Sequence, residues 1–185
     1  MREGGYLRHM RSLLPFALLA VLTSCGGQHE NPAAVAVDTT AVVAAVAPTV
    51  LDLSAFDTPL LVELGDMATL GVDSPAVKWN EEFGRLEVNA GDHFGLLITE
   101  EPGDLVRLKA DLDRDMLRKH TVIEEGPDKF VYRSEFPDDA GTFIHFYRMV
   151  QVGDRQFVIT DAEERRFNEA DVARMVGSIK VRSGA

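Results

Sequence analysis

Hydrophobic residues between positions 59 and 182 recur with two different spacings. A spacing of two, which is typical of strands with one buried face, occurs in several short segments. Gly, Asp and Pro separate many of these segments by only a few residues, so neighbouring strands are expected to run antiparallel. The expected strands are residues 60–64, 76–79, 85–90, 94–100, 121–125, 129–136, 142–152 and 156–161.

Two other segments have the spacing of an amphipathic helix. The first is 105–118, with Asp104 as its N-cap, and the second is 169–179, capped by Asn168. The stripe of the first helix consists of Leu105, Leu108, Leu112 and Met116. Strands, a helix, further strands and a C-terminal helix predict a single α+β domain, in which an antiparallel sheet is flanked by two helices.

The first 25 residues have the pattern of an export signal. Basic residues precede the apolar run 12–22, which is followed by Leu22-Thr23-Ser24-Cys25. About ten apolar residues are too few to cross a hydrocarbon core roughly 30 Å thick. The sequence from Leu22 to Cys25 resembles the lipobox of bacterial lipoproteins. This resemblance implies cleavage before Cys25 and a membrane anchor of fatty acyl chains, such as palmitate, on that residue.

The predicted organisation has three parts. Residues 1–24 are a lipoprotein signal peptide, 25–57 are the acylated cysteine and a flexible Ala/Val-rich tether, and 58–185 are the α+β domain. The tether offers little apolar surface to offset the entropy of ordering it, although a short Ala-rich helix is the alternative. Gly26, where lipoproteins of the inner membrane tend to carry Asp, favours the outer membrane and its periplasmic side; the cell surface is the alternative location.

Composition excludes several classes of function. The chain of 185 residues has 19 basic and 30 acidic residues and a net charge of -11. It therefore lacks the basic footprint that binding to nucleic acid needs. The single cysteine excludes an internal disulfide and a zinc site made of several cysteines. We expect no cofactor.

The C-terminal part resembles a known fold family. Residues 157–161, then Phe167, then a short helix that ends with Gly177-Ser178-Ile179-Lys180, are similar to the last strand and helix of the Mog1/PsbP-like fold. The resemblance implies an antiparallel sheet flanked by helices over residues 60–182. It also implies an accessory or binding role, because members of the family are chiefly proteins of that kind. No functional residue is carried over.

The sequence contains no specific motif for a catalytic or metal site. The aspartates in 111–115 have the opening spacing of a calcium loop, but the hydrophobic stripe places them on a helix. His93, His120 and His145 lack the spacing of a zinc motif, so no metal site is expected. Carboxylates are so numerous that a pair such as Glu87 and Glu100 can always be chosen. An envelope hydrolase that uses such a pair is the alternative function.

Residues 142–150 are more informative, because they are hydrophobic on both faces of the expected strand. Phe143, His145 and Tyr147 share one face, and Tyr132 on the preceding strand can extend it. Such a strand is either covered on both faces or offers an aromatic patch to a protein partner or small ligand. We predict a non-catalytic binding or accessory module of the cell envelope, held to the membrane by its lipid anchor and without a nucleic-acid partner.

Overall fold

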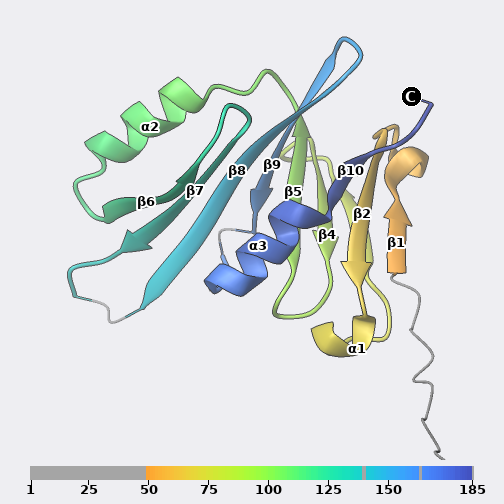
Figure 1. The fold of residues 1–185 in the computed structure, drawn as a ribbon, viewed down its shortest axis with the longest axis horizontal. Helices are drawn as coiled ribbons and strands as arrows, with labels where there is room; N and C mark the ends of the chain where they lie inside the picture. Colours follow the sequence, from red (N-terminus) through yellow and green to blue (C-terminus); the bar gives the residue numbers. More distant parts are fainter. Residues whose placement is uncertain (1–48, 139–140, 163, 185) are drawn as a thin grey trace, which may run out of the picture. The chain divides into compact units, whose positions relative to one another are not determined.

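The computed structural model describes residues 49–138, 141–162 and 164–184, which form one α+β domain with antiparallel sheets (Figure 1). The predicted class, a single α+β domain with antiparallel strands, is therefore confirmed. The signal peptide, Cys25 and the tether up to residue 48 lie outside the described residues. Within the described ranges, no helix has the length and apolar character needed to cross a membrane.

The elements follow the predicted order, with additions at both ends. In chain order they are β1 (Thr49–Asp52), the 3-10 helix η1 (Leu53–Phe56), β2 (Leu60–Gly65), α1 (Met67–Leu70), β3 (Ala76–Asn80), β4 (Arg85–Asn89), β5 (Gly95–Glu100), α2 (Leu105–Arg114), β6 (Lys119–Glu125), β7 (Lys129–Glu135), β8 (Thr142–Val152), β9 (Arg155–Asp161), α3 (Glu169–Ser178) and β10 (Ile179–Val181).

The strands form two sheets. The larger has seven strands in the order β3-β4-β5-β9-β8-β7-β6, and the smaller has three in the order β1-β2-β10. Every pair in the larger sheet joins consecutive strands except β5 with β9, where Leu96 lies opposite Asp161. This long-range pair joins the two halves of the sheet, so strands from both sides of α2 share one surface.

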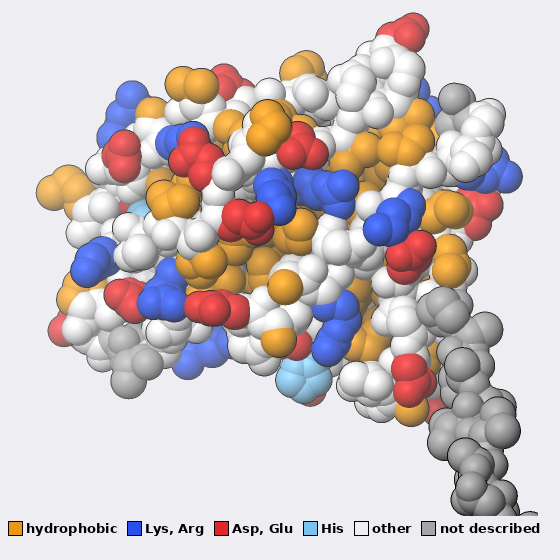
Figure 2. Space-filling view, in the orientation of Figure 1, with side chains coloured by type: hydrophobic (Ala, Val, Ile, Leu, Met, Phe, Trp, Pro, Cys, Tyr) orange, Lys and Arg blue, Asp and Glu red, His pale blue; other side chains and the backbone are white. Residues whose placement is uncertain are grey.

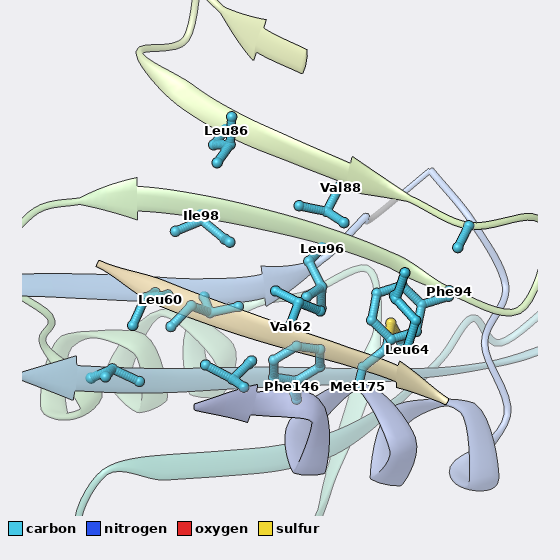
Figure 3. Close-up of a cluster of buried hydrophobic side chains, with 14 of the residues drawn as sticks. Leu60, Val62, Leu64, Leu86, Val88, Phe94, Leu96, Ile98, Phe146 and Met175 are labelled. Carbon is cyan, nitrogen blue, oxygen red and sulfur yellow. The ribbon is translucent and has the colours of Figure 1, made fainter. Parts of the chain in front are cut away.

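The hydrophobic core lies between the smaller sheet with α3 and one face of the larger sheet. Leu60, Val62 and Leu64 alternate along β2 and point into it (Figure 3). The core residues of the larger sheet and its loops that are labelled in the same figure are Leu86, Val88, Phe94, Leu96, Ile98 and Phe146, and Met175 joins them from α3. Period-two burial on β2 and helical burial on α3 thus close a single core.

α3 begins where the sequence predicts. The side chain of Asn168 accepts a hydrogen bond from the backbone N–H of Asp171 at 2.9 Å, and the Asp171 carboxylate accepts one from the N–H of Asn168 at 3.2 Å. This reciprocal capping box satisfies two backbone donors of the first turn. Figure 2 views the face that carries α3 and shows hydrophobic side chains gathered in its middle, among acidic and basic ones.

α2 covers the other face of the larger sheet. Along β8, Ile144 and Phe146 belong to the core, so His145 and Tyr147, which alternate with them, face the opposite side, toward Leu108 of α2. The Lys109 ammonium of α2 lies 5.3 Å from the centre of a β7 ring and pairs with a β6 carboxylate. α2 is thus placed over β6, β7 and β8.

The predicted first helix is too long. It ends at Arg114 instead of Arg118, and Met116, expected on its buried stripe, is 96% exposed. The Asp115 side chain accepts hydrogen bonds from the N–H groups of Leu117 at 2.8 Å and Arg118 at 3.2 Å. These local bonds give the backbone an alternative to the helical ones, which is why the helix stops there.

Three further predictions need correction. Residues 49–56, assigned to the tether, form β1 and η1, and Leu53 is fully buried in the core. The antiparallel strands form two sheets instead of one, because β10 leaves the end of α3 and pairs with β2. A third helix, the single turn α1, is capped by Asp66, whose side chain accepts from the N–H of Ala68 at 3.0 Å.

Candidate functional site

The four residues of the predicted patch lie together on the face that α2 covers. Tyr132 of β7 is directly opposite His145 of β8, and their ring centres are 5.3 Å apart. Phe143 stacks on the same imidazole at 6.3 Å, and Tyr147 lies opposite Phe130. Alternate positions on β8 and the direct pairing of Tyr132 with His145 therefore place the four side chains on one face.

A cavity of about 220 Å³, here called the α2-face cavity, lies between this face and α2. Phe143 is the one patch residue that does not line it, because its ring packs against Phe136 and beneath the guanidinium of Arg166. The cavity is lined by Thr99, Glu101, Leu108, Tyr132, His145, Phe146, Tyr147, Val158, Thr160 and Asp161. The predicted patch is thus partly covered, and its accessible part is a small polar cavity.

The segment before α2 is held to the cavity wall by backbone hydrogen bonds. The N–H of Gly103 donates to Gln156 Oε1 at 2.7 Å, and the N–H of Asp104 donates to the Tyr147 hydroxyl at 3.1 Å. A Cβ at Gly103 would lie 2.5 Å from Met149 Sδ and 3.0 Å from the Tyr147 hydroxyl. A side chain at this position would therefore displace the flexible end of Met149, because the backbone approaches the sheet closely.

His145 and Asp161 form a buried pair in the cavity wall. Nδ1 of His145 lies 2.8 Å from Oδ2 of Asp161, and Oδ1 of Asp161 accepts from the N–H of Phe146 at 2.8 Å. The carboxylate therefore favours the tautomer with the proton on Nδ1. Nε2 has no hydrogen-bond partner among the described residues, so it is the ring nitrogen left to accept a hydrogen bond from a ligand.

The remaining polar groups of the cavity are mainly hydroxyls. Burial raises the pKa of the Tyr147 phenol, and the nearby charges of Glu101 and Asp104 raise it further, so the phenol stays neutral at physiological pH. Thr99 and Thr160 add hydroxyls from β5 and β9. Each hydroxyl can both donate and accept, while Glu101 contributes a carboxylate.

A second histidine on the same face sits in a triad-like arrangement. Nδ1 of His120 lies 2.9 Å from the Ser134 hydroxyl, and Nε2 lies 3.0 Å from Oδ2 of Asp115. The residue types are those of a hydrolytic triad, but Ser134 is only 1% exposed and its hydroxyl cannot reach a substrate. The arrangement therefore joins the end of α2 to β6 and β7.

Asp115 is the most heavily hydrogen-bonded carboxylate of this face. The bond from His120 has the largest effect in holding its pKa well below the ordinary value, and the N–H of Leu117 and the Arg118 guanidinium lower it further. The carboxylate is thus ionised throughout the neutral range. The ring of His120 also contacts Tyr132 edge-on at 5.8 Å, which continues the row of rings toward His145.

The two carboxylates named for the hydrolase alternative each have basic or amide partners. Glu87 accepts from Asn80 Nδ2 at 2.8 Å and Arg85 Nε at 3.1 Å, and Glu100 accepts two bonds from Arg155. These bonds lower the pKa of both carboxyls. A glycosidase needs one carboxylic acid whose pKa is raised, so the environment of this pair is the opposite of what that chemistry requires.

The histidines of the domain lie with different partners. His93 is 3.3 Å from Asp171, whereas His120 and His145 pair with two other aspartates. In the part of the chain that the structure describes, no group of three or more His, Cys, Asp or Glu side chains is placed to hold a metal ion. Asp111 and Asp113 lie on α2, so the helical interpretation of the calcium-like run is confirmed for these two aspartates, whereas Asp115 follows the last helical residue.

Sequence reasoning missed four polar residues of the cavity: Thr99, Glu101, Thr160 and Asp161. Asp161 left a signal, because it is a carboxylate at the end of a predicted strand, 156–161, whose middle residues 157–159 are apolar. The other three are ordinary polar residues of strands and loops. The β8–β9 pair places Thr160 opposite Tyr147, and the pairing of β5 with β9 brings Thr99 and Glu101 to the same cavity.

Comparison with known proteins adds no family assignment. The chain matches no family model, no curated protein and no solved structure.

Proposed function

We propose that this protein is a lipid-anchored binding module of the cell envelope and that the α2-face cavity holds its ligand. The observation that carries the proposal is the buried His145–Asp161 pair in the wall of that cavity. Burying a carboxylate is costly, and here it holds an imidazole in one tautomer beside an enclosed space. A binding site gains from such fixed orientation, because less freedom is lost when the ligand arrives.

The lining indicates the chemistry of the ligand. Nε2 of His145 accepts a hydrogen bond, the carboxylate of Glu101 accepts others, and the hydroxyls do both. The volume of about 220 Å³ is smaller than the roughly 300–1,000 Å³ of sites for drug-sized ligands. A small compound with hydroxyl and ammonium groups fits these features, and the net charge of -11 attracts cations to the domain.

The Mog1/PsbP-like fold remains our proposal for the fold family. It is supported by the antiparallel seven-stranded sheet and by the C-terminal helix α3 that packs on it. An accessory or binding role is what that resemblance implies. It agrees with a cavity whose polar groups are arranged for hydrogen bonding.

A binding experiment can test the cavity directly. Ethanolamine and serinol, which carry both groups, are titrated into the full chain, with propionate as an anion of similar size. We expect the two amino alcohols to shift the imidazole ¹⁵N resonances of His145 saturably and propionate to leave them unchanged. Thr160→Val should weaken the response, while Asp154→Asn in an exposed turn should not. No saturable shift with either amino alcohol would contradict the proposal.

The anchor is tested separately at Cys25, which lies outside the described residues. We propose acylation of its thiol and attachment to the outer membrane, on the periplasmic side, as the lipobox resemblance implies. Cys25→Ala should leave the precursor uncleaved and without incorporated radiolabelled palmitate. Normal processing of that variant would contradict the anchor without affecting the cavity.

A further inference from the structure

A second hollow lies on the core face of the larger sheet, where η1 meets β3, β5 and β9. Its volume is about 330 Å³, and it opens on the opposite face from the α2-face cavity. Two buried residues, Ile98 and Phe157, line its inner part. The volume falls within the roughly 300–1,000 Å³ that is usual for sites of small ligands.

Two aromatic side chains of this hollow remain partly in water. Trp79, on the edge strand β3, is 48% exposed, and Phe56, the last residue of η1, is 37% exposed. Both line the same hollow, although they come from separate elements. Single exposed apolar residues are common, but two aromatic rings beside one concave apolar surface are typical of a binding site.

The polar side of the hollow is a fixed set of charged groups. Arg155 donates from Nε to one oxygen of Glu100 at 2.8 Å and from Nη2 to the other at 2.7 Å. Nη2 also donates to the carbonyl of Asp57 at 2.7 Å. This bidentate pair holds the guanidinium in one plane, and Nη1 has no hydrogen-bond partner among the described residues.

Asp57 adds a carboxylate at the rim. Its φ of 55° is in the left-handed region, and its N–H bonds to the carbonyl of Ser54 at 3.1 Å, so it caps η1. The carboxylate lies 3.4 Å from Arg155 and is otherwise largely exposed to solvent. The hollow thus presents aromatic surface together with carboxylate acceptors and the N–H donors of Arg155 Nη1.

We propose that this hollow binds a neutral saccharide through a pyranose ring stacked on Trp79. The flat C–H face of such a ring matches the apolar surface of Trp79 and Phe56. Its hydroxyls can donate to Glu100 and Asp57 and accept from Nη1 of Arg155. The two carboxylates disfavour an anion. Both already lie against the Arg155 guanidinium, at 2.7 Å and 3.4 Å, so we propose a neutral ligand that adds hydrogen bonds to this paired set instead of a further charge.

The chain provides its own reporter, because Trp79 is the only tryptophan in the sequence. Cellotriose and di-N-acetylchitobiose, whose equatorial substituents leave a flat ring face, are titrated into the full chain while tryptophan emission is recorded. We expect a saturable change in emission with at least one of them. Sorbitol carries similar hydroxyls without a ring face, so it should cause no saturable change.

Two variants test the two sides of the hollow. Glu100→Gln should weaken binding about tenfold or more, because a hydrogen bond to a charged group is lost. Phe56→Ala should also weaken saccharide binding, and it leaves the Glu100–Arg155 ion pair intact. This variant therefore tests the proposal even if Glu100→Gln does not fold. Glu169→Gln, which alters the Glu169–Arg133 pair at 2.8 Å elsewhere, should leave binding unchanged. No saturable change with either saccharide, or unchanged affinity in Phe56→Ala, would overturn the proposal without affecting the α2-face cavity.

Discussion

Nδ1 of His145 and Oδ2 of Asp161 are 2.8 Å apart in the interior of the domain, on neighbouring strands β8 and β9. Both residues are buried, and the same carboxylate accepts the backbone N–H of Phe146. The pair therefore links the position of the imidazole to the register of the two strands. Its loss should change both stability and the protonation pattern of the ring.

Asp161→Asn tests this link. The amide can still accept from the N–H of Phe146, but its NH₂ group opposes a proton on Nδ1 of His145. We expect the free energy of unfolding, measured by urea denaturation, to fall by about 1.5–3 kcal/mol. The imidazole ¹⁵N spectrum of His145 should show the other tautomer. Asp154→Asn, in the exposed β8–β9 turn, should stay within about 0.5 kcal/mol. An unchanged tautomer would show that the pair does not orient the ring.

Asp115 should make stability depend on acid pH. Its pKa is lower in the folded chain than in the unfolded one, where the pKa is about 3.9, so ionised Asp115 stabilises the fold above that pH. The contribution is lost as the pH falls toward the folded-state pKa. We therefore expect wild type to exceed Asp115→Asn in unfolding free energy above pH ~5 and the difference to shrink below pH ~4.

This difference is measured by denaturant unfolding over a series of pH values. Asp113→Asn on the exposed side of α2 is the matched control and should show a small difference at every pH. A constant difference between wild type and Asp115→Asn from neutral to acid pH would mean that ionisation of Asp115 does not contribute.

Two glycines separate backbone strain from steric contact. Gly91 and Gly153 have φ values of 71° and 60°, which side chains with a Cβ rarely adopt. A Cβ at Gly91 would overlap the carbonyl oxygen of Leu70, whereas a Cβ at Gly153 would meet open space. Gly153→Ala should cost about 1–2 kcal/mol, and Gly91→Ala about 1–3 kcal/mol more. Equal losses in thermal or urea unfolding would show that the Leu70 contact relaxes freely.

Met175 tests the packing of α3 on the core. It is fully buried, and its sulfur lies 3.3 Å from the backbone nitrogen of Gly95. Met175→Ala should lower the free energy of unfolding by about 2–5 kcal/mol. Val106 on α2 is 80% exposed, so Val106→Ala should change it by no more than about 0.5 kcal/mol. A small loss for both variants would place Met175 outside a packed core.

The local pattern was sufficient for the longer elements of the fold. Each strand predicted from period-two alternation occurs within two residues of its expected ends, and the caps at Asp104 and Asn168 are those observed. These features depend on residues that are close together in the sequence, so the local pattern is enough to predict them. The end of α2 was missed because Asp115 competes for nearby backbone donors, and a hydrophobic stripe does not register that competition.

The short strands β1 and β10 could not be predicted in the same way. Each has only three or four residues, and both are stabilised by pairing with β2, which is distant in sequence from β10. Residues 49–52 therefore resembled the preceding tether, and Ile179 resembled the end of a helix. Their strand conformation comes from the partner strand, since so short a segment has little preference of its own.

The candidate sites also combine features set by the local sequence with features set by tertiary contacts. The sequence by itself determined the α+β class and the presence of aromatic residues on one face of 142–150, because each depends on residues close together in the chain. Only the tertiary structure decided that Asp161 orients His145 and that Trp79 shares a hollow with Arg155 and Glu100. The first contact needs the register of β8 with β9, and the second needs the pairing of β5 with β9, which brings strands from the two halves of the chain together as one common core is buried.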